Sequence, residues 1–211
     1  MHTDFRGLYL VTPDWDDTER LLATTAAALS AGAALLQYRH KEASPALRRE
    51  QAAALLALCR RHDVPFIVND HIDLCRELDA DGVHVGGLDA GVATARAALG
   101  PDKIVGASCY GDLARAIDAQ AAGASYVAFG GFYPSRVKKY AVTTQPDILA
   151  QARAAGVTVP TVVIGGMTPA NAAVLVAAGA DMVAAISSVY GTAPTGVAAA
   201  VQAFTTLFSA S

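Results

Sequence analysis

The 211-residue sequence is poor in the residues that mark secreted, nucleic-acid-binding and membrane proteins. Its three cysteines, Cys59, Cys75 and Cys109, are odd in number and lack the spacing of a metal or redox motif. We therefore expect reduced thiols and a cytoplasmic location. The 16 Lys and Arg residues are outnumbered by 19 Asp and Glu residues, and the net charge of −3 argues against wide contact with nucleic acid.

Long apolar runs and targeting signals are missing as well. Residues 1–6 do not show the charged and then apolar pattern of a signal peptide. The apolar stretch 26–36 is too short to span a membrane, and Gly32 interrupts it. The sequence thus predicts a soluble intracellular protein without a membrane partner.

What the sequence does contain is a regular alternation of strand-like and helix-like segments. Hydrophobic residues make up 53% of the chain and charged residues 17%, which predicts a large core within one domain over residues 1–211. Strands are expected at residues 7–12, 33–39, 65–70, 82–86, 103–108, 126–130, 161–166 and 182–187. About eight βα units predict a closed (β/α)8 TIM barrel of the α/β class, with a doubly wound open sheet as the alternative.

The second expected strand ends in the most informative stretch of the chain, Gln37-Tyr38-Arg39-His40-Lys41. Alternate residues of a strand share one face, so Gln37, Arg39 and Lys41 are expected to point the same way. Two cations in a dry place repel each other, which indicates an anion between them. A strand that simply ends in solvated cations is the alternative, and on its own it is the commoner case.

The other strand ends carry polar residues that fit the same chemistry. In a (β/α)8 barrel the carboxyl ends of the strands face the active site. Those ends and the loops that follow them carry Asn69, Asp70, His84, Asp89, Ser108, Ser135, Lys138, Lys139, Gly165, Gly166, Ser187 and Ser188. Carboxylates, cations, hydroxyls and glycines at one barrel mouth indicate a phosphorylated substrate and a hard divalent cation such as Mg²⁺.

Several of these residues have simpler explanations. Asp70 and Asp89 each precede a helix-like segment and could be helix N-caps. His84 lies on an apolar strand, where a histidine is more often a hydrogen-bonded core residue than a ligand. Gly165 and Gly166 suit a tight turn as well as a phosphate site, and these two roles are compatible.

Seven short motifs, in order along almost the whole chain, resemble the thiamine-phosphate synthase (thiamine-phosphate pyrophosphorylase) family. They are Leu8-Tyr9-Leu10-Val11-Thr12, Gln37-Tyr38-Arg39-His40-Lys41, Asn69-Asp70, Asp81-Gly82-Val83-His84-Val85-Gly86 with Asp89, Gly106-Ala107-Ser108, Tyr133-Pro134-Ser135 with Lys138, and Ile164-Gly165-Gly166-Met167. The resemblance implies a (β/α)8 barrel. It also implies a Mg²⁺-dependent transferase that joins 4-amino-2-methyl-5-hydroxymethylpyrimidine diphosphate to 4-methyl-5-(2-phosphoethyl)thiazole, or to its carboxylated form, and releases pyrophosphate.

The resemblance also implies roles for individual residues. Arg39, Lys41, Ser108 and Lys138 would be catalytic, and Asp70 and Asp89 would hold Mg²⁺. The pyrimidine diphosphate would be bound by Gln37, Tyr38, Arg39, His40, Lys41, Asn69, His84, Ser108 and Lys138. The thiazole phosphate would be bound by Ser135, Arg136, Val137, Gly166, Ile186 and Ser187. The partners would be small phosphorylated molecules, and a homo-oligomer is left open.

Two other functions remain as alternatives. A thiazole tautomerase on the same barrel would need one phosphate site and a proton-moving histidine after the fifth strand, where this sequence has Ser108-Cys109-Tyr110. A non-catalytic phosphate-binding barrel would be expected to lose Asp70, Asp89 or Lys138 first, and all three are present.

The sequence departs from the family pattern at two places. Gly87 stands where the family usually has Gln, and Ser135-Arg136-Val137-Lys138 stands where it usually has Thr-x-Thr-Lys. The residues expected to hold the metal and the diphosphate are unaffected. The departures therefore concern the thiazole half of the site.

Restoring threonine at position 137 tests that half. If the loop holds the thiazole phosphate mainly through backbone N–H groups, valine serves nearly as well as threonine. Val137→Thr should then lower the KM for thiazole phosphate by at most about tenfold, the effect of one neutral hydrogen bond, with little change in kcat. Steady-state kinetics with varied thiazole phosphate measures this. A gain of several orders of magnitude would mean that the native acceptor is a different molecule.

Overall fold

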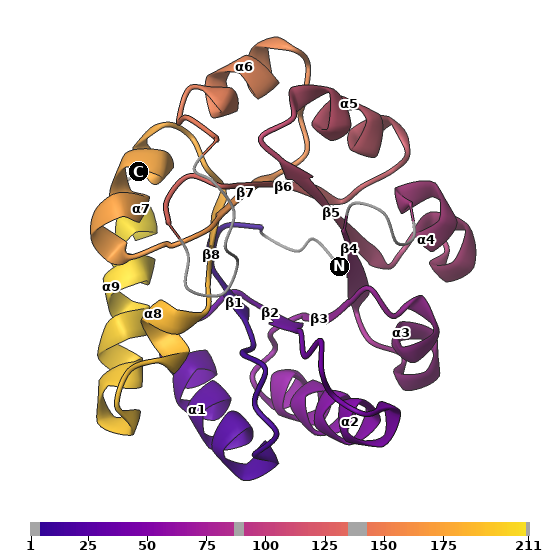
Figure 1. Cartoon of the computed structure of the whole chain (residues 1–211), viewed down its shortest axis with the longest axis vertical. Coiled ribbons are helices and arrows are strands. Elements are labelled where there is room, and N and C mark those ends of the chain that lie inside the picture. The colour runs from indigo at the N-terminus through magenta and orange to yellow at the C-terminus, as the bar shows by residue number, and fades with distance from the viewer. Residues whose placement is uncertain (1–4, 87–90, 135–142, 210–211) are drawn as a thin grey trace.

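The computed structural model describes residues 5–86, 91–134 and 143–209. Eight parallel strands form a closed ring in sequence order, and the last strand pairs with the first (Figure 1). Their bounds are β1 Gly7–Val11, β2 Leu35–Tyr38, β3 Phe66–Asn69, β4 Gly82–Val85, β5 Ile104–Tyr110, β6 Tyr126–Gly130, β7 Thr161–Ile164 and β8 Met182–Ala185. The predicted (β/α)8 barrel is confirmed, and closure of the ring excludes the open sheet.

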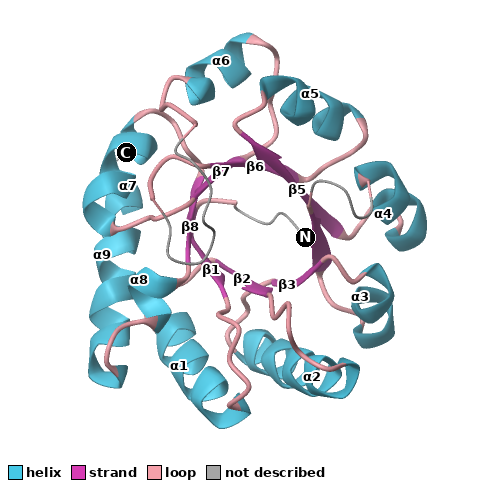
Figure 2. Ribbon diagram, viewed as in Figure 1, coloured by secondary structure: helices cyan, strands magenta, loops and turns pink. Residues whose placement is uncertain are grey.

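Helices surround the ring on its outside (Figure 2). They are α1 Thr18–Ser30, α2 Pro45–Arg61, α3 Ile72–Leu78, α4 Val92–Leu99, α5 Leu113–Ala121, α6 Ile148–Ala154, α7 Pro169–Ala177, α8 Ser187–Tyr190 and α9 Val197–Ser209, with a 3₁₀ turn at Pro194–Gly196. Side chains cap the N-termini of several helices. Ser44 caps α2 immediately before a proline, and Thr168 forms a capping box with Asn171 at α7. Within the described ranges, no helix is both long and apolar enough to cross a bilayer.

The strands divide their side chains between two cores. Outward residues such as Leu8, Leu36 and Phe66 pack against the helices. Inward residues fill the barrel with a second apolar cluster that includes Tyr9, Leu35, Ile67, Tyr126 and Met182. Because neighbouring residues of a strand face opposite sides, seven of the eight strands contribute to both cores, whereas β4 has Gly82 and His84 at its inward positions. The interior of the barrel is therefore packed below the carboxyl ends of the strands, where a (β/α)8 barrel carries its active site.

Most strand ends differ from the sequence prediction by one or two residues, and two of these differences lie beside residues of the predicted site. The eighth strand stops at Ala185, because Ile186 leaves the extended conformation (φ −120°, ψ −83°) and Ser187 begins the short helix α8. The fifth strand instead continues to Tyr110 through a register shift after Ser108. The three cysteines are free and buried, and burial raises the pKa of the Cys59 and Cys109 thiols to about 12. They are therefore core residues with little thiolate character.

Candidate active site

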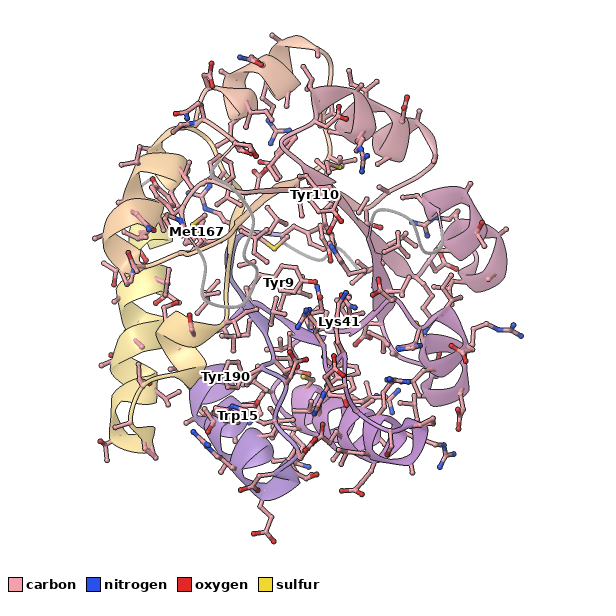
Figure 3. All side chains as sticks on the ribbon, viewed as in Figure 1. Tyr9, Trp15, Lys41, Tyr110, Met167 and Tyr190 are labelled. Atoms are coloured by element: carbon pink, nitrogen blue, oxygen red, sulfur yellow. The ribbon has the colours of Figure 1, made fainter. Side chains whose placement is uncertain are left out.

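A pocket of about 720 Å³ opens at the carboxyl ends of the strands. Four strands, β2 to β5, and the residues that follow them bring predicted site residues to it, namely Gln37, Arg39, Lys41, Asn69, Asp70, His84 and Ser108. Tyr9 lies inside the ring of strands (Figure 3), and Lys41 lines the same pocket. Apolar side chains, among them Val162, Ile164 and Ile186, line it at β7 and β8, and polar groups from Asp112, Arg115 and Thr143 line it beyond β5 and β6. The pocket thus has a polar side at β2 and β3 and an apolar side at β7 and β8.

The alternation predicted for the second strand is present at the pocket. Gln37, Arg39 and Lys41 all line it, although the regular strand ends at Tyr38. Thr12, just after β1, continues the pairing with its side chain: its hydroxyl donates to the Arg39 carbonyl (3.0 Å) and accepts from the Arg39 N–H (2.8 Å). The chain beyond β2 is therefore held in register with the first βα loop.

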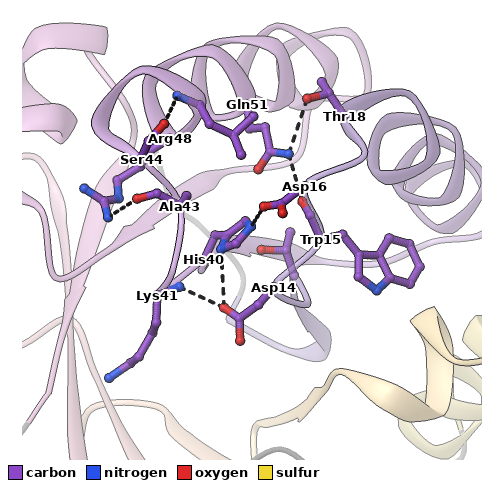
Figure 4. Close-up of polar contacts among 12 residues, drawn as sticks. Asp14, Trp15, Asp16, Thr18, His40, Lys41, Ala43, Ser44, Arg48 and Gln51 are labelled. Carbon is purple, nitrogen blue, oxygen red and sulfur yellow. Dashed lines mark hydrogen bonds and ion pairs between the residues drawn. The ribbon is translucent and has the colours of Figure 1, made fainter.

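An anion already lies beside the two cations, and it belongs to the protein. Asp14, in the first βα loop, accepts from Arg39 Nη1 with both carboxylate oxygens, at 3.3 and 3.2 Å. The same carboxylate accepts from the backbone N–H of Lys41 at 2.8 Å (Figure 4). The side chain of Arg39 is 10% exposed and that of Asp14 is 34% exposed. Asp14 thus orients the guanidinium while leaving the Lys41 ammonium available to the pocket.

Among the described residues predicted to bind the pyrimidine diphosphate, two lie outside this pocket. Tyr38 points outward and its hydroxyl donates to Gln51 on α2 at 3.0 Å. His40 is buried against the first βα loop, with its Nε2 3.0 Å from Asp16. Both line a smaller hollow of about 390 Å³ beside the pocket. They occupy the positions between Gln37, Arg39 and Lys41 and so face the opposite side, and their part in binding the diphosphate stays a prediction.

Asp70 is not a helix cap. The N-cap of α3 is His71, which makes no side-chain capping bond. Asp70 instead has a left-handed backbone (φ 62°), and its N–H donates to the His84 carbonyl at 2.9 Å. Asn69 Nδ2 donates to Asp70 Oδ2 at 2.6 Å, while Oδ1 accepts no bond from a described residue. An uncommon backbone conformation that presents a carboxylate to a pocket is typical of a functional position.

This carboxylate fits a divalent cation of the magnesium type. Among the described residues there is no group of three or more His, Cys, Asp or Glu side chains that could form a metal cage. Mg²⁺ does not need one, because it commonly takes one or two carboxylates and completes its shell with water and substrate phosphate. Asp70 places one carboxylate of this kind at the pocket.

Two glycines follow β7 on the side of the barrel opposite β2 and β3, where the main chain passes close to residues 131–134. Gly165 and Gly166 both have positive φ, at 112° and 63°. A side chain at Gly166 would overlap the carbonyl of Pro134, so only glycine fits there. Ile186 lines the pocket, and Ser187 follows it at the start of α8.

Some predicted residues fall in the parts of the chain that the structure leaves undescribed. They are Asp89, Ser135, Arg136, Val137, Lys138 and Lys139. The pocket also contains residues that the sequence did not single out, among them Tyr9, Tyr110 and Arg115. Tyr9 could have been found by the alternation that identified Gln37, since it is an inward position of β1.

The sequence of the whole chain can be compared with those of known proteins. Residues 8–189 match the family model described as thiamine monophosphate synthase. The chain belongs to this family. A protein named thiamine-phosphate synthase from Janthinobacterium sp. (strain Marseille) is 64% identical over 99% of this chain and 100% of its own length. A second, from Methylobacillus flagellatus, is 51% identical over 88% of both chains.

A solved structure supports the same family membership. The structure titled thiamine phosphate pyrophosphorylase from Pyrococcus furiosus matches with a TM-score of 0.83 and 29% identity, over 99% of this chain and 98% of its own. The predicted family is confirmed. The chain is accordingly a transferase of thiamine biosynthesis in the thiamine monophosphate synthase family.

Removing the charge of Asp14 tests its contact with Arg39. Asp14→Asn keeps an oxygen for the Lys41 N–H but loses the ion pair, which is worth about 1 kcal/mol for a partly exposed pair. Thiamine phosphate formation should then lose about fivefold in kcat/KM, because the guanidinium is no longer held in one orientation. Steady-state kinetics measures the loss.

Asp16→Asn is the matched control. Asp16 contacts only the His40 ring among the described residues, and its side chain is 85% exposed. This variant should retain wild-type kinetics. Wild-type kcat/KM in Asp14→Asn would show that Arg39 is positioned without the ion pair.

Proposed function

We propose that the chain forms thiamine phosphate by joining 4-amino-2-methyl-5-hydroxymethylpyrimidine diphosphate to 4-methyl-5-(2-phosphoethyl)thiazole, or to its carboxylated form, with release of pyrophosphate. One observation carries this proposal. Fixed cations, an amide and a carboxylate, from Arg39, Lys41, Asn69 and Asp70, meet on the β2–β3 side of the pocket, and apolar side chains line its β7–β8 side. A diphosphate suits the first side and two heteroaromatic rings suit the second.

The reaction needs charge stabilisation more than proton transfer. The C–O bond between the pyrimidine methylene and the diphosphate breaks, and a bond forms between that carbon and the thiazole nitrogen. Positive charge develops on the methylene and negative charge on the leaving diphosphate. The thiazole nitrogen attacks with its own lone pair and has no proton to lose, so no general base is required. Such a site should lower the activation barrier mainly through charged and polar groups that are already oriented toward the leaving diphosphate.

The residues of β2 and β3 would bind the leaving group. Arg39, held by Asp14, would offer its remaining guanidinium N–H groups to the diphosphate. Lys41 would add a point charge, and Asn69 would add an amide donor. Lys138, which lies outside the described residues, would complete the set from the loop after β6.

Asp70 would hold the metal together with the diphosphate, and Asp89 is proposed as the second ligand. Mg²⁺ would supply positive charge to the leaving phosphate oxygens. Asp70 Oδ1 is the atom best disposed for this role, because Oδ2 is already hydrogen-bonded to Asn69.

The thiazole phosphate is proposed to lie between the ends of β7 and β8. Barrels of this class often bind phosphate there, with backbone N–H groups and a short extra helix. Gly165 and Gly166 follow β7 with positive φ values and no side chains of their own, and α8 begins directly after Ile186. Ser135, Arg136 and Val137, outside the described residues, are proposed to cover the same phosphate.

The direct test mixes the purified chain with both phosphorylated substrates and Mg²⁺. Thiamine phosphate and pyrophosphate should appear in equal amounts. Rearrangement of the thiazole alone would favour a tautomerase, and binding without any product would favour a non-catalytic phosphate-binding barrel. Either result would contradict the proposal that this chain catalyses the synthase reaction.

Removing the charge of Asp70 tests the metal site. Asp70→Asn keeps the size of the side chain, so the fold should persist, but the amide is a poor Mg²⁺ ligand. Turnover at ordinary Mg²⁺ should nearly vanish, and the Mg²⁺ concentration needed for half-maximal rate should rise. A Mg²⁺ titration of the rate, with circular dichroism as the folding control, measures both. Full activity of this variant at low Mg²⁺, or of the wild type in excess chelator, would rule the metal role out.

A further inference from the structure

Five side chains from five strands form one hydrogen-bonded row across the inside of the barrel. Gln37 Nε2 donates to the Tyr9 hydroxyl at 2.7 Å, and that hydroxyl lies 2.6 Å from the hydroxyl of Tyr126. The Tyr126 hydroxyl lies 3.0 Å from His84 Nδ1. His84 Nε2 in turn lies 2.8 Å from Ser108 Oγ. The two ends of the row, Gln37 and Ser108, are residues of the pocket wall.

Each of the two phenols has one proton to give. Tyr9 and Tyr126 are fully buried, and burial raises the pKa of both well above the ordinary value for tyrosine. Both hydroxyls are therefore protonated at neutral pH. A neutral hydroxyl donates one hydrogen bond and accepts others, so every bond along the row has a direction.

The amide at one end sets that direction. An amide nitrogen can only donate, so the Tyr9 oxygen accepts from Gln37 and the Tyr9 proton goes to Tyr126. The Tyr126 proton is then directed at His84 Nδ1, which must be unprotonated to accept it. In the neutral imidazole the proton is then on Nε2 and is donated to Ser108 Oγ. The hydrogen of the Ser108 hydroxyl is left to point elsewhere.

We propose that Tyr9 and Tyr126 are positioning residues that fix the polarity of the pocket wall. They hold Gln37 with its amide oxygen toward the ligand and leave Ser108 with its hydroxyl hydrogen toward the ligand. The pocket then offers an acceptor on the β2 side and a donor on the β5 side. Only the identity of the ligand rests on the proposed function. If that function is correct, the amino group of the aminopyrimidine donates to the Gln37 amide oxygen. The Ser108 hydroxyl donates to a ring nitrogen or to a diphosphate oxygen.

The packing around Tyr126 holds the row in place independently of its hydrogen bonds. A side chain at Gly106 would overlap the phenol of Tyr126, so the strand leaves out a Cβ where that ring passes. The Tyr9 and Tyr126 rings meet edge to face, with centroids 5.7 Å apart. The rings of His84 and Tyr126 lie nearly parallel at the same separation. Glycine in the Gly106-Ala107-Ser108 motif thus has a physical reason, which is the space taken by Tyr126.

The protonation of His84 gives a test that needs no substrate. We expect long-range ¹H–¹⁵N spectra of the free protein at neutral pH to show Nε2 protonated and Nδ1 unprotonated. The His84 signals are assigned by their loss in His84→Gln. In Tyr126→Phe the donor to Nδ1 is gone, and the two tautomers should become mixed. A wild-type spectrum with Nδ1 protonated would reverse the polarity and overturn the proposal, whatever the protein catalyses.

Kinetics of three phenylalanine variants gives the second test. Tyr9→Phe and Tyr126→Phe keep the rings and remove the hydroxyls. Each should raise the KM for the pyrimidine diphosphate by up to about tenfold, the effect of one neutral hydrogen bond, and leave the KM for thiazole phosphate unchanged.

Tyr190→Phe is the matched control for these variants. Its hydroxyl is equally buried and bonds Thr25 on α1 at 2.9 Å, outside the pocket. Loss of that hydroxyl should lower the melting temperature without changing either KM. If Tyr9→Phe and Tyr126→Phe lost stability with both KM values unchanged, as Tyr190→Phe is expected to do, the tyrosines would only fill the barrel. The positioning role would then be wrong, even where the wild type makes thiamine phosphate.

Discussion

The rest of the structure depends on the strict alternation of side chains along the strands of a closed barrel. A closed ring has an inside with no solvent below its mouth, so every inward side chain must fill space or find a polar partner. Leu35 and Ile67 do the first, whereas Gln37 and Asn69, two positions further along, reach the mouth. The inward face of a single strand thus contributes an apolar residue to the barrel core and, two residues later, a polar residue to the pocket wall.

The cationic part of the pocket shows how a weakly acidic protein builds an anion site. Arg39 and Lys41 would repel each other if both were held in a dry pocket, and part of that repulsion is offset by Asp14. The carboxylate lowers the net charge available to a ligand. It also fixes the direction of the guanidinium before the ligand arrives, which spares the cost of ordering a long side chain on binding. The site therefore gives up some attraction and gains preorganisation.

The barrel, the pocket and most of its polar residues could be predicted from the sequence because they follow from periodicity. Gln37, Arg39 and Lys41 are predicted because alternate residues of a strand share one face. The same rule places Tyr38 and His40 on the other face, whereas a sequence motif groups all five residues together. Asp14 could not be found this way, since it lies in a loop whose path depends on tertiary contacts. The end of β8 was missed because Ile186 is apolar, and nothing in its side chain signals a change of backbone direction.

Tyr9 and Tyr126 escape notice in the sequence because they stand in runs that read as apolar core, and their rings do pack there. Their hydroxyls change what that core can do. A buried hydroxyl costs free energy unless it is bonded, and inside a barrel the bonds must come from other strands. A row of such bonds ends only where a group can turn to the pocket, as Gln37 and Ser108 do. The requirement to satisfy two buried phenols thereby determines which atoms the protein presents at its active site.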